Sequence, residues 1–303
     1  MNRREFIKTG VVAGSALLLS HPFRLLAASE GQGGCDLVAV RGGGAAEMFR
    51  RGIAEMGGMG TIVRSGQSVV VKPNIGWDTA PERGACTNPE LVGEVVRQCV
   101  AAGAGKVEVL DHTCDLWKSC YRNSGIEAAV KSAGGQMVPA NSRRHYTSVG
   151  IPAGKSLKDA KVHRNVLAAD VFINVPVLKH HGSTRLTLGM KNLMGVVWDR
   201  GYWHRNDLHQ CIADFSTFMR ADLTIMDGYR VMRTNGPMGV SEGDVVLVKA
   251  QIIARDPVAL DAASARMFGL EPDDVGYIRI ADAMKVGSKD LESITIRKVK
   301  VTG

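Results

Sequence analysis

Short apolar runs alternate with amphipathic stretches along this chain, at intervals of roughly 30 residues through its first half. The apolar runs predict strands over residues 36–40, 68–71, 106–110, 137–138, 171–178, 223–226, 245–254 and 294–299. The stretches between them predict helices over residues 45–56, 89–102, 125–133, 207–219 and 275–284, with another that begins at Pro257. Strands that alternate with helices are typical of right-handed βαβ units. The pattern therefore predicts an α/β fold with a mostly parallel, Rossmann-like layered sheet and helices on both faces.

Capping residues mark two of the predicted helix starts. Asn88 precedes Pro89, and Asp256 precedes Pro257. The side chains of Asn and Asp accept hydrogen bonds from the free N–H groups of a first turn, where proline is also tolerated. Between two predicted strands, residues 140–162 are polar, basic and rich in Gly and Ser. This composition predicts a small inserted segment, either an irregular excursion or an antiparallel insert.

The first 28 residues differ from this pattern and resemble a twin-arginine signal peptide. Arg3 and Arg4 are followed by an apolar pair and Lys8, residues 9–20 are weakly apolar, and small residues surround Ala28. The apolar segment is shorter than the ~20 residues that a membrane-spanning helix needs. We therefore expect residues 1–28 to be removed on export, residues 30–303 to form a single α/β domain, and the mature protein to be periplasmic. The alternative is the basic start of a cytosolic protein.

Changing Arg3 and Arg4 together to lysine should hold the precursor in the cytoplasm, because the export machinery reads the arginine pair. Cell fractionation of the wild type and the double variant measures the effect. Normal export of the variant would refute the signal assignment.

Composition and charge narrow the classes of function. The chain has 303 residues, of which 45% are hydrophobic and 22% charged, an ordinary globular composition that can bury a core. Loss of residues 1–28 would change the balance of Lys/Arg to Asp/Glu from 38 against 30 to 34 against 29, or +5. So small an excess, without basic runs interleaved with aromatic residues, argues against nucleic-acid binding. After residue 28 no apolar stretch is long enough to span a bilayer, so we expect no membrane insertion after cleavage.

The sequence contains six cysteines, which are Cys35, Cys86, Cys99, Cys114, Cys120 and Cys211. An even number in an exported protein permits three disulfides, and a bond between Cys114 and Cys120 is one that the spacing allows. None has C-x-x-C spacing, so neither a ferredoxin-type nor a zinc-ribbon motif is present. Disulfide, metal ligand and free thiol all remain open for Cys86, Cys114, Cys120 and Cys211, whereas Cys99 is expected to be a buried apolar residue.

Polar residues follow several predicted strands at the point where each one ends. Ligands of open α/β sheets bind outside the carboxyl ends of the strands, so residues delivered there by several strands are candidates for one site. These candidates are Lys72, Asn74, Asp111, His112, Cys114, Lys179, His180, His181, Lys191, Asn192 and Asp227. At a strand end, we expect Lys179 to be an exposed site residue. The segment 198–205 is dense in aromatic and charged residues, and we expect it to line a ligand or a lid.

With these residues in view, the chain resembles a family known as domain-of-unknown-function family 362. The matching segments are VVVKPNIG at 69–76, LKH at 178–180, LTL at 186–188, KNLMG at 191–195, MDG at 226–228, NGP at 235–237 and DPVALD at 256–261. Together they cover roughly residues 68–290. Many members of this family carry an added ferredoxin-like domain with C-x-x-C-x-x-C runs and are labelled iron–sulfur proteins. The resemblance therefore implies a redox role, although this sequence has no such run.

Our first hypothesis is a metal ion or an iron–sulfur cluster with a redox role and a redox partner. His112 and Cys114 stand two residues apart on one predicted loop, and His181 would face them across the crevice. Thiolate and imidazole ligands together suit zinc, iron or an iron–sulfur cluster.

The second hypothesis is a metal-free site for a small anion such as a carboxylate or a phosphate. Lysine ammonium groups would supply charge and asparagine amides hydrogen bonds, from Lys72, Asn74, Lys179, Lys191 and Asn192. General acid–base chemistry would come from Asp111, His180 and Asp227. A third possibility is a non-enzymatic maturation or partner factor that uses the same pocket.

Overall fold

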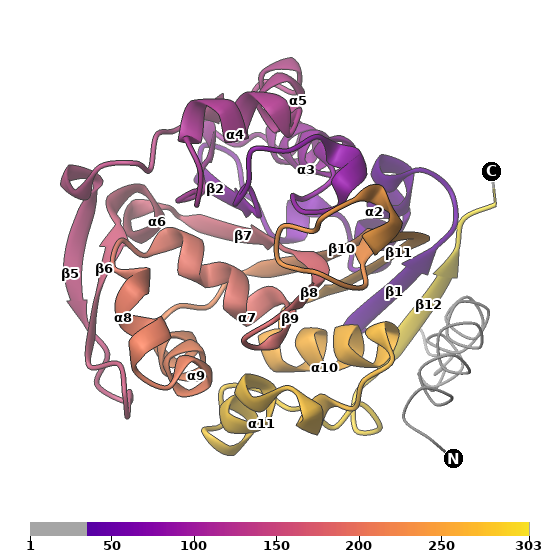
Figure 1. Ribbon diagram of the computed structural model, residues 1–303. Coiled ribbons are helices and arrows are strands. Elements are labelled where there is room, and N and C mark those ends of the chain that lie inside the picture. Colours follow the sequence, from indigo (N-terminus) through magenta and orange to yellow (C-terminus); the bar gives the residue numbers. More distant parts are fainter. Residues whose placement is uncertain (1–34, 303) are drawn as a thin grey trace, which may run out of the picture.

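The computed structural model describes residues 35–302, so the predicted signal peptide lies outside the described residues. A ten-stranded sheet runs through the middle of the molecule in the order β12-β1-β11-β10-β7-β2-β3-β4, with β8 and β9 attached at β10 (Figure 1). Its strands are β1 (Leu37–Arg41), β2 (Ser68–Pro73), β3 (Lys106–Val109), β4 (Gln136–Met137), β7 (Val171–Val175), β8 (Val177–His181), β9 (Arg185–Thr187), β10 (Leu223–Met232), β11 (Val245–Ala254) and β12 (Ile296–Lys300).

Most neighbouring strands are parallel, which confirms the predicted α/β fold class. Strands β10, β7, β2, β3 and β4 form one parallel series, and β12 is parallel to β1. Strand β11 is antiparallel to both β1 and β10. The first predicted βαβ unit is therefore not formed. Strand β1 pairs with β11 and β12 rather than with β2, because strands from the end of the chain occupy the places beside it.

Helices cover both faces of the sheet, as predicted. One face packs against α2 (Ala45–Glu55), α3 (Pro89–Ala101), α4 (Trp117–Asn123) and α5 (Ile126–Ser132). The other packs against α6 (Arg164–Ala168), α7 (Gly189–Asn192), α8 (Arg200–Arg205), α9 (Leu208–Phe218), α10 (Pro257–Phe268) and α11 (Gly276–Ala283). Within β2, Val69 and Val71 enter the first core and Val70 enters the second. This alternation is the period of two expected for a strand buried on both faces.

Both predicted helix caps and the predicted insert are confirmed. The Asn88 side chain accepts a hydrogen bond from Glu90 N at 2.9 Å, and Asp256 accepts from Val258 N at 2.7 Å. The insert is an antiparallel pair of strands, β5 (Tyr146–Gly150) and β6 (Asp159–His163). It extends to one side of the main sheet (Figure 1).

The predicted strand over residues 171–178 is two strands, divided at Pro176. Proline has no N–H for the ladder, so β7 ends before it and β8 begins after it. Strand β7 pairs with β2 and β10, whereas β8 pairs with β10 and β9. Lys179, His180 and His181 therefore lie within a strand and not in a loop, and their side chains alternate between its two sides.

Candidate functional site

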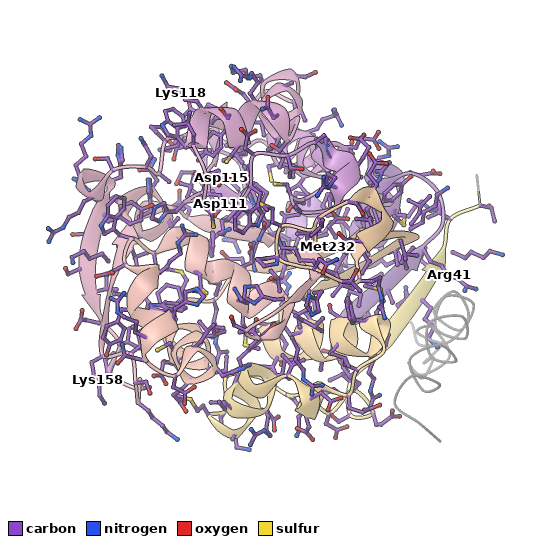
Figure 2. All side chains as sticks on the ribbon, in the orientation of Figure 1. Arg41, Asp111, Asp115, Lys118, Lys158 and Met232 are labelled. Atoms are coloured by element: carbon purple, nitrogen blue, oxygen red, sulfur yellow. The ribbon has the colours of Figure 1, made fainter. Side chains whose placement is uncertain are left out.

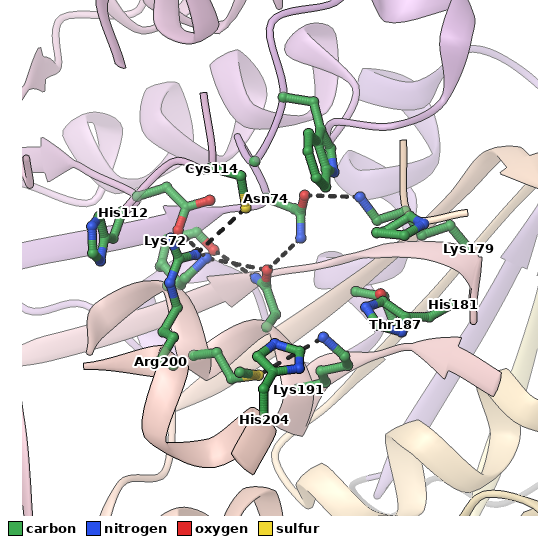
Figure 3. A pocket seen from close by; sticks show the side chains of 18 of the residues that line it. Lys72, Asn74, His112, Cys114, Lys179, His181, Thr187, Lys191, Arg200 and His204 are labelled. Atoms are coloured by element: carbon green, nitrogen blue, oxygen red, sulfur yellow. Dashed lines mark hydrogen bonds and ion pairs between the residues drawn. The ribbon is translucent and has the colours of Figure 1, made fainter. Parts of the chain in front are cut away.

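A cavity of about 510 Å³ opens beyond the carboxyl ends of β2 and β3 (Figure 3). Its walls come from the end of β2, from the segments that follow β2 and β3, from β8 and β9, from α7 and the turn after it, and from α8. The predicted site residues that line it are Lys72, Asn74, Asp111, His112, Cys114, Lys179, His181, Lys191 and Asn192. The cavity thus brings together nearly all of the predicted set, and below we call it the cationic pocket.

Lys72 and Asp111 form a buried ion pair in the wall of the cationic pocket. The distance from Lys72 Nζ to Asp111 Oδ1 is 2.7 Å, and the two side chains are 1% and 4% exposed. The other carboxylate oxygen, Oδ2, accepts a hydrogen bond from Ile75 N at 2.6 Å. Burial lowers the pKa of Lys72, and the nearby Asp111 carboxylate opposes that change. The charge of Lys72 is therefore already neutralised within the protein.

A chain of amide hydrogen bonds connects this pair to the neighbouring lysine. Asn192 Oδ1 accepts from Lys72 Nζ at 3.1 Å and from Asn74 Nδ2 at 3.0 Å. Asn74 Oδ1 in turn accepts from Lys179 Nζ at 3.2 Å. Each amide is held through its oxygen, which fixes the orientation of the Asn74 and Asn192 side chains.

Two buried side chains fix the short helix α7, which carries Lys191 and Asn192. Gly189 N donates to Asp261 Oδ1 at 2.6 Å, and Met190 N donates to Asp261 Oδ2 at 3.0 Å. Asn174 of β7 donates through Nδ2 to the carbonyl oxygen of Gly189 at 2.9 Å. The DPVALD motif therefore reaches the cationic pocket indirectly, by holding the backbone from which Lys191 projects.

Lys179 and Lys191 are buried and have no carboxylate partner among the described residues. Lys179 is 1% exposed, and its ammonium donates to Asn74 Oδ1 and to the carbonyl oxygen of Ala85. Lys191 is 9% exposed, and within the described residues the hydrogen-bond partner of its nitrogen is Met194 Sδ, at 3.8 Å. Burial is the main cause that lowers the pKa of Lys179 to about 8 and that of Lys191 to about 7. The expectation that Lys179 is exposed was wrong, because its side chain points across the cavity wall and not into solvent.

The segment 198–205, which was predicted to line a ligand or a lid, lies in the wall of the cationic pocket. It contributes Trp198, Arg200, Gly201 and His204. Arg200 Nη2 donates to the carbonyl oxygen of Thr113 at 2.9 Å, and Nη1 lies 3.8 Å from Cys114 Sγ. Arg200 adds a further positive charge that sequence reasoning did not single out.

Two of the histidines that line the cationic pocket, His112 and His181, are each held through one ring nitrogen. His181 Nδ1 accepts a hydrogen bond from Ser183 N at 3.1 Å, and burial, followed by the charge of Lys191, lowers its pKa to about 3. His112 Nδ1 lies 3.0 Å from the carbonyl oxygen of Val197, and its ring stacks on Trp198 with centroids 5.0 Å apart. Burial also lowers the pKa of His112. Both rings are therefore neutral near pH 7.

Two predicted catalytic residues, His180 and Asp227, do not line the cationic pocket. His180 projects from the opposite side of β8 to its neighbours, and its Nδ1 accepts from Gly236 N at 3.1 Å. The carboxylate of Asp227 accepts from Asn88 N at 2.7 Å and from Tyr229 N at 2.9 Å, so it holds the start of α3. Burial raises the pKa of Asp227 to about 6. Asp111 alone of the predicted acid–base set lies in the cavity.

The predicted metal ligands line one cavity but do not form a metal-binding group. Within residues 35–302, no three His, Cys, Asp or Glu side chains gather so that they could hold a metal ion. All six cysteines fall in this range and are free thiols, so the disulfide between Cys114 and Cys120 is not formed. An iron–sulfur cluster needs several thiolates, and the surrounding lysines and Arg200 would repel a cation. The residues of the cationic pocket therefore do not fit the predicted metal ion or cluster formed by His112, Cys114 and His181.

Comparison with known proteins places the chain among its relatives. It is 29% identical over 226 residues to a thylakoid-associated protein of Synechocystis sp., an alignment that covers 72% of this chain and 68% of that protein. The structure resembles the lactate racemase apoprotein from Thermoanaerobacterium thermosaccharolyticum with a TM-score of 0.45 and 12% identity, over 70% of this chain and 53% of that chain. It resembles a protein from Thermotoga maritima with a TM-score of 0.46 and 10% identity, over 78% and 59%.

The chain thus spans between half and three fifths of the length of these two solved chains. A family model described as a domain of unknown function (DUF362) matches residues 69–266. This range contains most of the strands and helices that build the cationic pocket, and it is well over half of the chain. The protein belongs to the DUF362 family.

Proposed function

We propose that the protein binds a small anionic molecule, a carboxylate or a phosphate, in the cationic pocket. The observation that supports this is an uncompensated positive charge. Lys179, Lys191 and Arg200 face a cavity in which Asp111 is the one carboxylate among the described lining residues, and Asp111 is paired with Lys72. An anion in the cavity would supply the negative charge that the protein does not.

Burial of these positive charges destabilises the folded protein when no anion is bound. A buried ammonium group loses hydration, and its interaction with an opposite charge must compensate that loss. The lowered pKa values of Lys179 and Lys191 express this cost. A bound anion would restore both values towards the ordinary range of lysine. Binding and protonation of these lysines should therefore favour each other.

The remaining lining of the cationic pocket sets the kind of anion. Trp77 and Trp198 supply flat apolar surface, and the amides of Asn74 and Asn192 lie beside the ammonium groups. The hydroxyl oxygen of Thr187 is buried without a hydrogen-bond partner in the described part of the chain. A ligand with a charged end, a short carbon skeleton and a second polar group would satisfy these features.

Replacing Lys179 with methionine should weaken anion binding by roughly tenfold to a hundredfold, since a hydrogen bond from a charged donor is worth about 1.5–3 kcal/mol. Isothermal titration with phosphate, acetate and succinate measures the effect. Lys158→Met is the matched control, because Lys158 is exposed. It lies at the edge of the molecule, whereas Asp111, which marks the position of the cationic pocket, lies in the interior (Figure 2). Equal affinities in the two variants would contradict the proposal, as would the absence of binding in the wild type.

We further propose that the protein is exported, which rests on the resemblance of residues 1–28 to a twin-arginine signal peptide. The relative from Synechocystis sp. is described as thylakoid-associated, which supports a location at or beyond a membrane. No helix between residues 35 and 302 is long and apolar enough to cross a bilayer.

A further inference from the structure

The cationic pocket has two regions that differ in how their polar groups are satisfied. In one region Lys72, Asp111, Asn192, Asn74 and Lys179 are joined by an ion pair and hydrogen bonds. In the other region, Lys191 Nζ contacts a sulfur atom, and the Thr187 hydroxyl has no hydrogen-bond partner among the described residues. Figure 3 shows Lys191, His204, Thr187 and His181 on one side of the cavity, away from Lys72 and Cys114.

Lys191 is the lysine of the cationic pocket whose nitrogen is open to a ligand. The ammonium groups of Lys72 and Lys179 are engaged by oxygen atoms, whereas in the described part of the chain Lys191 Nζ has only the weak contact with Met194 Sδ. Its side chain is nine-tenths buried, and α7 is anchored through Asp261. The nitrogen is therefore held in place at the cavity surface, and no oxygen atom within residues 35–302 binds it that a reaction would have to displace.

The surroundings of Lys191 also favour the neutral amine, which is the reactive form. Burial and the neighbouring Lys179 ammonium lower its pKa to about 7, so about half of the side chains are unprotonated at that pH. A desolvated lysine beside another cation is a recognised form of an activated nitrogen nucleophile. The geometry alone marks the group as accessible, and the charge distribution makes it nucleophilic.

We infer that Lys191 condenses with the carbonyl group of a bound anionic aldehyde or ketone to form a Schiff base. This inference rests on the proposed function and adds a substrate class to it. Lys179 and Arg200 would hold the carboxylate or phosphate of the substrate, and Lys191 would reach its carbonyl carbon. The Thr187 hydroxyl, which has no partner in the described residues, would hydrogen-bond to the carbonyl oxygen.

The condensation needs no oxidant or reductant. The nitrogen lone pair forms the C–N bond while the π electrons of the C=O bond move to oxygen, and one proton passes from nitrogen to that oxygen to give a carbinolamine. Protonation of the hydroxyl group and cleavage of the C–O bond then release water and leave an iminium ion. In sum, an amine, a carbonyl compound and a proton become an iminium ion and water.

Borohydride trapping tests the inference on the full chain. The probes are pyruvate and dihydroxyacetone phosphate, which carry a carboxylate and a phosphate beside a carbonyl group. We expect borohydride to fix one adduct per chain, and peptide mapping to place it on Lys191. At pH 7 the labelling rate at Lys191 should exceed that at exposed Lys158 by roughly 10²-fold, because a far larger fraction of its amine is neutral.

Two variants keep the outcome interpretable. Lys191→Met should form no specific adduct, and Lys179→Met should still be labelled at Lys191 but require a higher probe concentration. If calorimetry shows that a probe binds and no adduct forms on Lys191, the inference is wrong while the proposed function stands. Labelling that falls on Lys179, or equally on surface lysines, also overturns it. If neither probe binds or reacts, the inference is wrong, and the titrations with phosphate, acetate and succinate decide the proposed function separately.

Discussion

Replacing Lys191 with methionine should stabilise the folded protein by about 2–4 kcal/mol at pH 7. The wild type carries a desolvated amine whose pKa falls from 10.5 to about 7 on folding, so part of the folding free energy is lost in stripping its proton or its hydration. Methionine is unbranched and apolar, and it would lie against the Met194 sulfur that Lys191 already contacts. We thus expect Lys191, a residue of the proposed binding site, to reduce the free energy of unfolding more than any other side chain of that site.

The size of this stabilisation should depend on pH in a defined direction. The pKa of Lys191 is lower in the folded than in the unfolded protein, so between pH 7 and 10.5 the unfolded chain binds a proton that the folded chain has released. The destabilisation by Lys191 is therefore complete below pH 7 and diminishes as the pH rises. Between pH 7 and 8.5 the advantage of Lys191→Met should shrink by roughly 1.5 kcal/mol.

Urea unfolding of both proteins at pH 6, 7 and 8.5 measures this difference. The comparison cancels other titrating groups such as Asp261, whose pKa burial raises to about 8. The buffers must lack phosphate and carboxylates, because a bound anion would stabilise the wild type by mass action. Lys158→Met serves as the charge control and should leave stability nearly unchanged. A variant at Lys191 that is less stable than the wild type, or an advantage independent of pH, would contradict the expectation.

Gly195→Ala should abolish anion binding and destabilise the protein by about 3–5 kcal/mol, the range observed when a buried ion pair is broken. A Cβ atom at this residue would lie 1.8 Å from Asp111 Oδ1 and 2.6 Å from Lys72 Nζ. Neither group can easily give way. Asp111 is held by Ile75 N, and Lys72 Nζ also donates to the carbonyl oxygen of Pro73 at 2.7 Å. The added methyl group must therefore separate the pair or push the backbone of Gly195 out of the cavity wall.

Gly182→Ala is the matched control for this substitution. Gly182 lies in the turn after β8, close in sequence to His181, and a Cβ atom there would have no heavy atom within 4 Å. We expect its effect on unfolding to stay within about 0.5 kcal/mol, and anion affinity to be unchanged. Titration calorimetry and urea unfolding of the two variants side by side give the result. Retention of normal stability by Gly195→Ala would show that the ion pair is not confined as tightly as its contacts indicate.

The sequence predicted which residues meet at the edge of the sheet better than it predicted their state. Lys72 and Asn74 lie at and just beyond the carboxyl end of β2, and Asp111 follows the end of β3, so the rule that ligands bind beyond the carboxyl ends of parallel strands was enough to bring them together. The burial of Lys72 and Asp111 could not be predicted. It arises from packing between segments far apart in the chain, such as the close approach of Gly195 to both side chains.

The site residues that were predicted wrongly or overlooked each have a separate physical explanation. His180 and Asp227 were wrong as pocket residues because a polar side chain at a strand end can equally well bind the backbone, and nothing in the local pattern distinguishes the two uses. Arg200 was overlooked because the pattern of residues 198–205 identified the segment but not the side chain that points inward. Thr187 belongs to the LTL motif, but its missing hydrogen-bond partner is a property of the folded protein alone.

The alternation of side chains along β8, the strand that begins after Pro176, limits the changes in length that this strand can tolerate. Lys179 and His181 point into the cavity and His180 points away because three consecutive residues of β8 occupy alternate sides. Deleting or inserting one residue in Val177–His181 would exchange these sides and turn His180 inward in place of both neighbours. Length variants that keep the site must therefore gain or lose residues of β8 in pairs, and natural variation in length should collect instead in the turn at Gly182.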